Sequence, residues 1–168
     1  MKQKYAFLDR DGALIYEPPE DETVSGEVPY QIDSLEKLKV LPGVLAGLKA
    51  LVESGYKLVM VSNQDYLGRT VFPRSDFERP QQRFLQILRE EGVEFEDVFV
   101  CPHGADDGCL CRKPQIGLVE EFFERNDVDM ENSFMYGDRG SDEAFARNLG
   151  IRFVKVETNG EFNLKLLI

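Results

Sequence analysis

Residues 5–12 read YAFLDRDG, and this segment decides the fold. Its first four residues are apolar and form a run short enough for a strand buried on both faces, and the run stops at Asp9. Further short apolar runs, separated by longer segments of helical periodicity, occupy residues 57–61, 98–100, 133–136 and 151–156. This alternation predicts an α/β fold, a three-layer αβα sandwich around a mainly parallel, Rossmann-like central sheet.

The segments between these strands predict four helices. We expect them at residues 42–55, at 75–91, from Pro114 through Phe123, and at 142–149. Pro114 is placed in the first turn of the third helix, because proline is tolerated there. Pro80 marks either the true start of the second helix or a kink in it.

Two segments lie outside this pattern. Residues 17–41 are acidic and contain three prolines, which favours an irregular flap over a helix. The tail at 162–168 predicts a last strand or a linker. With 168 residues, the chain is expected to form a single domain over residues 1–168.

Composition excludes several classes of function. The chain carries 20 Lys and Arg against 31 Asp and Glu, a net charge of −11, which argues against binding nucleic acid or an anionic membrane by bulk electrostatics. No apolar run reaches the roughly 18 residues of a membrane span. The first apolar run, residues 5–8, is also too short for a signal-peptide core, so we expect a cytoplasmic protein. In such a protein an odd number of cysteines, 3, argues against a disulfide framework.

The first strand leads into two acidic residues. On an extended segment, the side chains of Asp9 and Asp11 would lie on one side, about 6.6 Å apart, so that one could attack while the other handles a proton. Gly12 allows a sharp turn close to a ligand. A plain turn or the start of a calcium loop are alternatives, but residues 13–15 supply no further acidic ligands for calcium.

A second acidic cluster follows the run at 133–136. If the sheet brings Asp138 and Asp142 next to Asp9 and Asp11, the carboxylates would need a cation to offset their repulsion. An all-oxygen site of this kind suits Mg²⁺. The alternative is that both residues cap a helix N-terminus, which suits Asp142 better than Asp138.

Two polar pairs complete the set of strand-end residues. Ser62 and Asn63 follow the run at 57–61, where a hydroxyl and free N–H groups could grip phosphate oxygens, although Ser-Asn is also ordinary turn chemistry. Arg112 and Lys113 precede an expected helix N-terminus, which favours anions. The simpler explanation of Lys113 is a surface lysine.

The order of these four motifs along the chain resembles that of the haloacid dehalogenase-type phosphatases. The resemblance implies that Asp9 is the nucleophile, that Asp11 is the general acid and base, and that phosphate is held by Ser62 and Lys113. It also implies that Mg²⁺ is bound by Asp9, the backbone carbonyl of Asp11 and Asp138, with Asp142 in support. Ala13 stands where the family often has Thr, which removes a hydroxyl but leaves the backbone N–H, so activity should survive.

All cysteines and the only histidine lie within eleven residues, at Cys101, His103, Cys109 and Cys111. Three thiolates and one imidazole form a closed tetrahedral set for a structural Zn²⁺. The alternative is a set of free thiols near a turn. We therefore expect a zinc loop at 101–111, which would also position Lys113.

This loop narrows the resemblance to two groups, the histidinol-phosphatases and the heptose-bisphosphate phosphatases. The residues around Glu17, Asn63 and Phe72 are closer to the histidinol-phosphatases, often the N-terminal half of a bifunctional enzyme. The resemblance implies hydrolysis of a small phosphate monoester, L-histidinol phosphate, and a possible fused or associated dehydratase domain outside this chain.

The charged residues near the motifs bear on this choice. Acidic Glu17 and the flap at 20–22 suit an ammonium and an imidazole, and we expect Glu17, Ser62, Asn63, Arg112 and Lys113 to bind substrate. Arg69 and Arg74 could instead form a second cationic pocket for a sugar bisphosphate. Compared with the family, the flap is longer by several residues around 23–29, a departure that bears on the substrate.

Two readings from other classes remain. A receiver-like phospho-acceptor domain also gathers Asp, a hydroxyl and Lys at strand ends, but it would place its Lys after the last acidic residue, and here Lys113 precedes Asp138. A zinc-stabilised binding module would leave the strand-end motifs unexplained.

Overall fold

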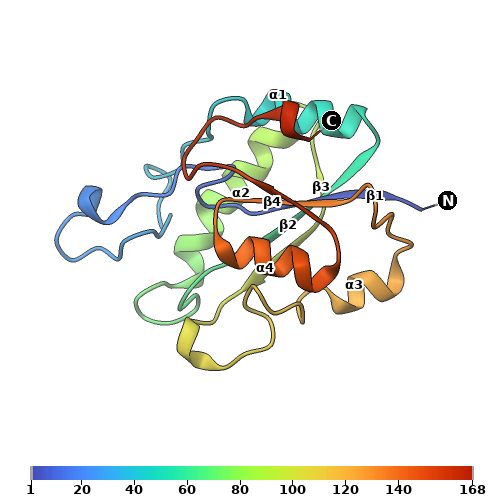
Figure 1. The fold of residues 1–168 in the computed structure, drawn as a ribbon. Coiled ribbons are helices and arrows are strands. Elements are labelled where there is room, and N and C mark those ends of the chain that lie inside the picture. The colour runs from blue at the N-terminus through green and yellow to red at the C-terminus, as the bar shows by residue number, and fades with distance from the viewer. Residues whose placement is uncertain (1, 168) are drawn as a thin grey trace.

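The structure is a computed structural model that describes residues 2–167. Within these residues, five parallel strands form one sheet in the order β3-β2-β1-β4-β5. Helices cover both faces of the sheet (Figure 1). The expected three-layer αβα sandwich is thereby confirmed. The strands are β1 (Lys4–Leu8), β2 (Tyr56–Asn63), β3 (Phe95–Cys101), β4 (Phe134–Gly137) and β5 (Arg152–Lys155).

Two apolar cores hold the layers together, one on each face of the sheet. Successive residues of β1 point to opposite faces, so Ala6 and Leu8 belong to one core while Tyr5 and Phe7 belong to the other. The first core packs against α1 and α2, and the second packs against α3 and α4. The helices are α1 (Val44–Glu53), α2 (Arg74–Glu90), α3 (Glu120–Arg125) and α4 (Gly140–Leu149).

The predicted start of the third helix is wrong. The helix begins at Glu120 rather than near Pro114. The backbone N–H of Gly117 donates to the carbonyl of Leu110 (2.9 Å), so residues 114–119 are tied to the preceding loop and form turns instead. A Cβ at Gly117 would lie 2.4 Å from that carbonyl oxygen, so the close approach requires glycine.

Two further expectations are settled in the helices and the tail. Helix α2 begins at Arg74 and continues through Pro80, so Pro80 is not its start. The tail forms a short 3-10 helix, Leu164–Leu166, rather than a strand. Its position is fixed by Phe162, whose ring packs 4.7 Å from that of Tyr136.

The acidic segment 17–41 is largely irregular, as expected for a flap, with one turn of 3-10 helix at Glu20–Glu22. It is anchored to the body by Ile32, which is fully buried in the core. Lys37 forms ion pairs with Glu27 and Asp33 within the segment. The flap therefore extends from the sheet (Figure 1) and is anchored to the body toward its C-terminal end.

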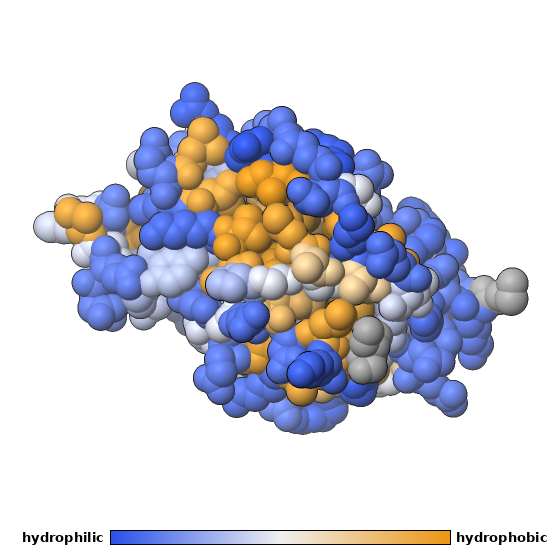
Figure 2. Space-filling view, turned by 90° about the horizontal axis from the view of Figure 1, so that it is seen from above, coloured by the Kyte–Doolittle hydropathy of each residue, from blue (hydrophilic) through white to orange (hydrophobic). Residues whose placement is uncertain are grey.

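None of the helices in residues 2–167 has the length and apolar character needed to cross a membrane. The view from above shows apolar side chains gathered in the middle of the face that carries α1, with hydrophilic residues around them (Figure 2). Exposed apolar residues of the molecule include Val52 on α1 and Leu166 in the tail.

Candidate active site

The carboxyl ends of the central strands bring together residues from distant parts of the chain. Asp9 follows β1, and the Lys113 ammonium lies 2.8 Å from its Oδ1. The same ammonium lies 2.8 Å from Oδ1 of Asp142 on α4 and donates to the carbonyl of Val61 at 2.6 Å. All three charged residues are buried. Lys113 is therefore not a surface lysine but the centre of an internal ionic cluster.

The electrostatics of this cluster are unfavourable for the carboxylates. Burial raises the pKa of Asp9 well above its usual range, and the neighbouring Asp142 raises it further, while Lys113 works in the opposite direction. Burial opposes the charged form of Lys113, but Asp9 and Asp142 outweigh it and raise its pKa. One ammonium thus serves two carboxylates, with Asp138 close by. A bound cation would relieve this excess of negative charge.

The carboxylates fit a divalent cation. Asp9, Asp138 and Asp142 each offer an oxygen atom, and these atoms lie within 4.8 Å of one another. Oδ1 of Asp138 is buried and has no hydrogen-bond partner among the described residues, whereas Oδ2 accepts from the Thr158 hydroxyl at 2.6 Å. An all-oxygen set with a free buried acceptor is the donor set that Mg²⁺ prefers.

Gly12 makes room for this arrangement. Its φ of +77° is the left-handed conformation, and a Cβ there would lie 2.8 Å from Oδ2 of Asp138. The expected sharp turn of the backbone after Asp11 is thus present. It brings the backbone after β1 against Asp138, which follows β4.

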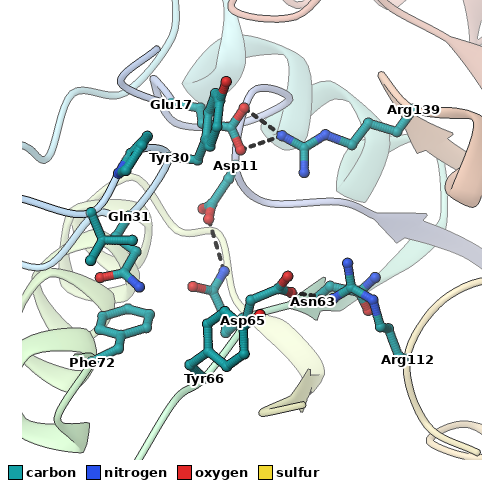
Figure 3. Close-up of a pocket in the computed structure, with 13 residues that line it drawn as sticks. Asp11, Glu17, Tyr30, Gln31, Asn63, Asp65, Tyr66, Phe72, Arg112 and Arg139 are labelled. Atoms are coloured by element: carbon teal, nitrogen blue, oxygen red, sulfur yellow. Dashed lines mark hydrogen bonds and ion pairs between the residues drawn. The ribbon is translucent and has the colours of Figure 1, made fainter. Parts of the chain in front are cut away.

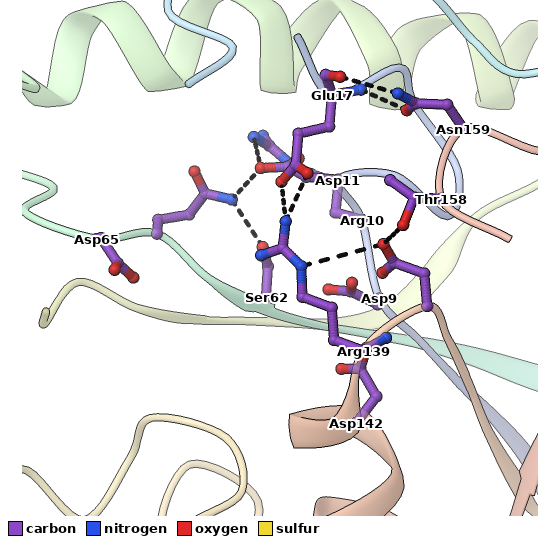
Figure 4. A network of polar contacts seen from close by, with 12 residues as sticks. Asp9, Arg10, Asp11, Glu17, Ser62, Asp65, Arg139, Asp142, Thr158 and Asn159 are labelled. Carbon is purple, nitrogen blue, oxygen red and sulfur yellow. Dashed lines mark hydrogen bonds and ion pairs between the residues drawn. The ribbon is translucent and has the colours of Figure 1, made fainter. Parts of the chain in front are cut away.

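The Asp11 carboxylate points away from the other three. It accepts from Nε of Arg10 at 2.6 Å and from Nε2 of Gln64 at 2.8 Å. Arg10 is itself fully buried, bonded to Gln81 and positioned over the ring of Phe77. This network orients Asp11 beside Asp9 without making its carboxylate part of the possible metal site (Figure 4).

The last two residues of β2, Ser62 and Asn63, have different roles from those expected. Ser62 is buried beneath Gln64, whose Nε2 donates to its hydroxyl at 2.8 Å. Asn63 instead lines the small pocket over Asp9, and it bonds both the N–H and the carbonyl of Lys113. The other residues lining this pocket are Asp9, Asp11, Lys113, Arg139, Ser141 and Asp142.

Asp142 also fulfils the alternative expected of it. Its Oδ2 accepts from the backbone N–H of Arg139 at 3.1 Å, which satisfies a free donor at the start of α4. The same side chain thus caps the N-terminus of α4 and faces Lys113. Asp138 lies before the helix and does not have this capping contact in the described residues.

The cysteine cluster is assembled as expected for a metal site. The Cys101 sulfur lies 3.0 Å from that of Cys111, 3.7 Å from that of Cys109 and 3.5 Å from Nδ1 of His103. All three cysteines are free thiols. Four such donors facing one another fit a tetrahedral zinc ion. The cluster is joined to the site because the N–H of Arg112, the residue before Lys113, points to the Cys109 sulfur at 3.4 Å.

A cavity of about 620 Å³ opens beside Asp11 between the flap and the loop after β2. Two ion pairs line it, Glu17 with Arg139 and Asp65 with Arg112 (Figure 3). Burial raises the pKa of Glu17 to about 7, although Arg139 opposes the shift. Of the residues expected to bind substrate, Glu17, Asn63 and Arg112 line this cavity, whereas Ser62 and Lys113 do not.

Sequence reasoning missed the contribution of the segment after β5. The Asn159 amide bonds both the N–H and the carbonyl of Glu17, at 2.7 and 2.9 Å, and its own N–H donates to the Gly12 carbonyl. Asn159 has a φ of +60°, and Gly160 follows it. An Asn-Gly pair signals a turn, but nothing in the sequence connects that turn to Glu17.

Arg139 is the second residue whose role the sequence did not reveal. It lines both the small pocket over Asp9 and the large cavity, and its side chain reaches the Glu17 carboxylate. It therefore lies where the two pockets meet. Its place after Asp138 was visible in the sequence, but its pairing with Glu17 on the flap was not.

Solved structures with a similar fold include two phosphatases. The D,D-heptose 1,7-bisphosphate phosphatase from B. bronchiseptica, complexed with magnesium and phosphate, is 29% identical and superposes with a TM-score of 0.78, over 95% of this chain and 83% of its own. A haloacid dehalogenase-like phosphatase from Mesorhizobium loti is 26% identical with a TM-score of 0.70, over 89% of this chain and 70% of its own. The fold is that of the haloacid dehalogenase-type phosphatases.

Within this class the family is defined by sequence. The model of the polynucleotide kinase 3 phosphatase family matches residues 4–159, and the chain belongs to that family. Among curated relatives, the histidine biosynthesis bifunctional protein HisB of Campylobacter jejuni subsp. doylei is 45% identical over 92% of this chain. HisB of Buchnera aphidicola is 42% identical over 97% of this chain. The chain spans 42% and 43% of the length of these two relatives.

Proposed function

We propose that this chain is a Mg²⁺-dependent phosphatase that hydrolyses L-histidinol phosphate to L-histidinol and phosphate. The observation that carries the proposal is the buried cluster of Asp9, Lys113 and Asp142 at the strand ends, beside a cavity that opens on Asp11. The named HisB relatives and the sequence around Glu17 favour this substrate.

The proposed reaction has two displacements. The Asp9 carboxylate attacks phosphorus, the bond to the alcohol oxygen breaks, and Asp11 gives that oxygen a proton. Asp11 then takes a proton from water, whose oxygen attacks the phosphorus of the aspartyl phosphate and regenerates the Asp9 carboxylate as phosphate leaves. The Lys113 ammonium stabilises the charge on the transferring group.

The structure suggests how the remaining residues serve this reaction. Arg10 and Gln64 hold Asp11, and Asn63 fixes the backbone of Lys113. Asp9, the backbone carbonyl of Asp11 and Asp138 would bind Mg²⁺, with Asp142 in support. When bound, Mg²⁺ supplies positive charge that favours the ionised Asp9 and offsets charge on the phosphoryl oxygens.

The alternative substrate is a heptose bisphosphate. The similarity of this chain to a solved D,D-heptose 1,7-bisphosphate phosphatase favours this substrate. The second phosphate of such a substrate would need a free cationic group in the cavity. The candidates for that group are less suitable than the sequence suggested, because Arg69 pairs with Asp107 at 2.6 Å, and neither Arg69 nor Arg74 lines the cavity. Arg112 and Arg139 line it but already face carboxylates.

The proposal also covers the zinc loop, the cellular location of the protein and its partner domain. Zinc bound by Cys101, His103, Cys109 and Cys111 would staple residues 101–111 and hold Lys113 in place. The protein would act in the cytoplasm on a small molecule. A dehydratase domain, fused or separate, would be its partner, since the relatives extend well beyond the part matched here.

Phosphate release from L-histidinol phosphate and from heptose bisphosphate, each with and without Mg²⁺, tests the assignment. We expect turnover of histidinol phosphate that depends on Mg²⁺. Faster turnover of the heptose bisphosphate would make it the substrate and leave the phosphatase class unchanged. If neither compound is hydrolysed, both substrate assignments are rejected.

The Asp9→Asn variant tests the covalent mechanism. It removes the nucleophile and one of the crowded carboxylates, so we expect turnover to fall below detection with no loss of thermal stability. Substantial residual activity in a folded variant would contradict an aspartyl phosphate on Asp9.

A further inference from the structure

One polar side chain of the flap is buried without a use in the fold. Gln31 lines the large cavity and is only 7% exposed. Its Oε1 is buried and has no hydrogen-bond partner among the described residues. Buried side-chain carbonyls are normally paired, because leaving one unpaired forfeits its hydration. An unpaired amide in a cavity wall indicates a group kept for a ligand.

The backbone fixes Gln31 in this position. Ile32, the next residue, is fully buried in the core. Tyr30, the residue before it, has a φ of +66°, which a residue with a side chain rarely adopts, and its N–H donates to the carbonyl of Pro18. Strained conformations of this kind persist where the surrounding structure requires them. The amide is thus held against the cavity rather than left on a free loop.

Aromatic side chains line the same cavity as this amide. Phe72 is buried, and Figure 3 shows it directly beside the Gln31 amide. Tyr30 and Tyr66 line the same cavity. Tyr66 also has a left-handed backbone, with a φ of +65°, and it leaves room only for a glycine at position 104, where a Cβ would lie 2.6 Å from its ring.

The chemistry of this end of the cavity is that of a subsite for a planar nitrogen ring. Flat apolar walls accept a ring, and a side-chain amide offers N–H donors and a carbonyl acceptor for the ring nitrogens. The charged residues nearby do not compete, because Glu17 pairs with Arg139 and Asp65 with Arg112. A polyhydroxylated sugar would leave the aromatic walls poorly used.

We propose that Gln31, with Tyr30, Tyr66 and Phe72, forms a leaving-group subsite that binds a nitrogen heterocycle of the substrate. The proposal rests on the proposed function, for which the ring is the imidazole of L-histidinol phosphate. Gln31 hydrogen-bonds a ring nitrogen while Asp11, on the same cavity, faces the ester oxygen. Gln31 is then a specificity-determining residue of the flap.

The test is the Gln31→Leu variant, with Gln31→Met as a second apolar replacement of similar length. Gln86→Leu, on the exposed side of α2, is the matched control. Loss of one hydrogen bond to the ligand should raise the KM for L-histidinol phosphate and the Kd of L-histidinol about tenfold. Inhibition by inorganic phosphate should not change, because phosphate does not reach Gln31. The melting temperature should stay level or rise, since an unpaired buried carbonyl is removed.

Calorimetric binding of L-histidinol to the wild-type protein, with Mg²⁺ and phosphate present, separates this proposal from the proposed function. Wild-type binding that Gln31→Leu and Gln31→Met leave unchanged overturns the subsite, whatever the turnover. Weakened binding in both variants supports the subsite even if the wild type hydrolyses only the heptose bisphosphate, which would contradict the proposed function alone. A wild type that does not bind L-histidinol contradicts the subsite.

Discussion

Thr158 acts on a single oxygen atom. Its hydroxyl donates to Oδ2 of Asp138 and leaves Oδ1 free, so the carboxylate presents one oxygen to a cation. Groups that orient a metal ligand in this way typically change affinity by about 10- to 100-fold when removed. Thr158 is therefore a positioning residue for the proposed Mg²⁺ site.

The Thr158→Val variant should lower Mg²⁺ affinity by about 10- to 100-fold, measured by calorimetry and by the Mg²⁺ concentration for half-maximal activity. Thr158→Ser, which keeps the hydroxyl, should restore it. Thr70→Val, at an exposed position, is the control. Unchanged Mg²⁺ affinity in a folded Thr158→Val protein would show that the hydroxyl does not orient Asp138.

Glu17 should make stability depend on pH. Burial raises its pKa from 4.5 to about 7, so between these values the folded protein holds a proton that the unfolded chain has lost. The free energy of unfolding should therefore fall as pH rises through this window, by up to about 3 kcal/mol for a shift of this size. Below pH 4.5 Glu17 is protonated in both the folded and the unfolded state, so this loss of stability is absent there.

Urea unfolding from pH 4 to 8, without added Mg²⁺, compares the wild type with Glu17→Gln. The variant cannot titrate at this position, so its stability should decline less between pH 4.5 and 7. The comparison rests on the slopes, because the variant also alters the contact with Arg139. Parallel curves would mean that Glu17 has an ordinary pKa.

Among individual residues, those that end strands were the ones the sequence could identify. Asp9 and Asp138 directly follow recognisable strands, so the rule that parallel strands share one functional edge was enough to group them. Lys113 was expected before a helix that in fact begins only at Glu120, so only the order of the motifs grouped it with the others. Gln31, Thr158 and Asn159 lie in irregular segments. Their contacts depend on how loops far apart in sequence meet, and no periodicity records that.

At the scale of elements, the stability of the cysteine loop is expected to depend on a bound metal rather than on the apolar core. The loop has little apolar surface, and its cluster is connected to Lys113 through Arg112 and Asn63. Metal binding would supply the folding free energy that such a loop lacks. Whether this loop is folded should therefore determine the position of Lys113.

The Cys109→Ser variant should lower both the zinc content, measured by atomic absorption, and phosphatase activity. Leu110→Ser, at the exposed position between two cysteines, is the control and should change neither. Retained activity after loss of zinc would refute the coupling between the loop and Lys113.

The elements differ in how well sequence alone located them. Strands and α1 were found because apolar runs and glycine boundaries agree. Helix α3 was misplaced because Pro114 is an equally good start of a turn, and the contact of Gly117 with Leu110 that decides between them joins two loop residues. Local propensity could not choose between the two.

For the whole molecule, the sheet order β3-β2-β1-β4-β5 explains why some of the acidic residues behind the net charge of −11 lie close together. The central position of β1 places Asp9 between β2 and β4, so the residues after those strands meet around it. Part of the acidic excess is concentrated in that crevice rather than spread over the surface. The fold class followed from the alternation of strands and helices, which is a property of the entire chain.

The amide of Asn159 joins the segment after β5 to Glu17, 142 residues earlier. On a ribosome, the N-terminal strand and the flap emerge long before this partner exists. The cavity wall at Glu17 can acquire these backbone contacts only after residue 159 has left the exit tunnel. A nascent chain that has not reached this residue therefore lacks the contacts that hold Glu17 in the cavity wall.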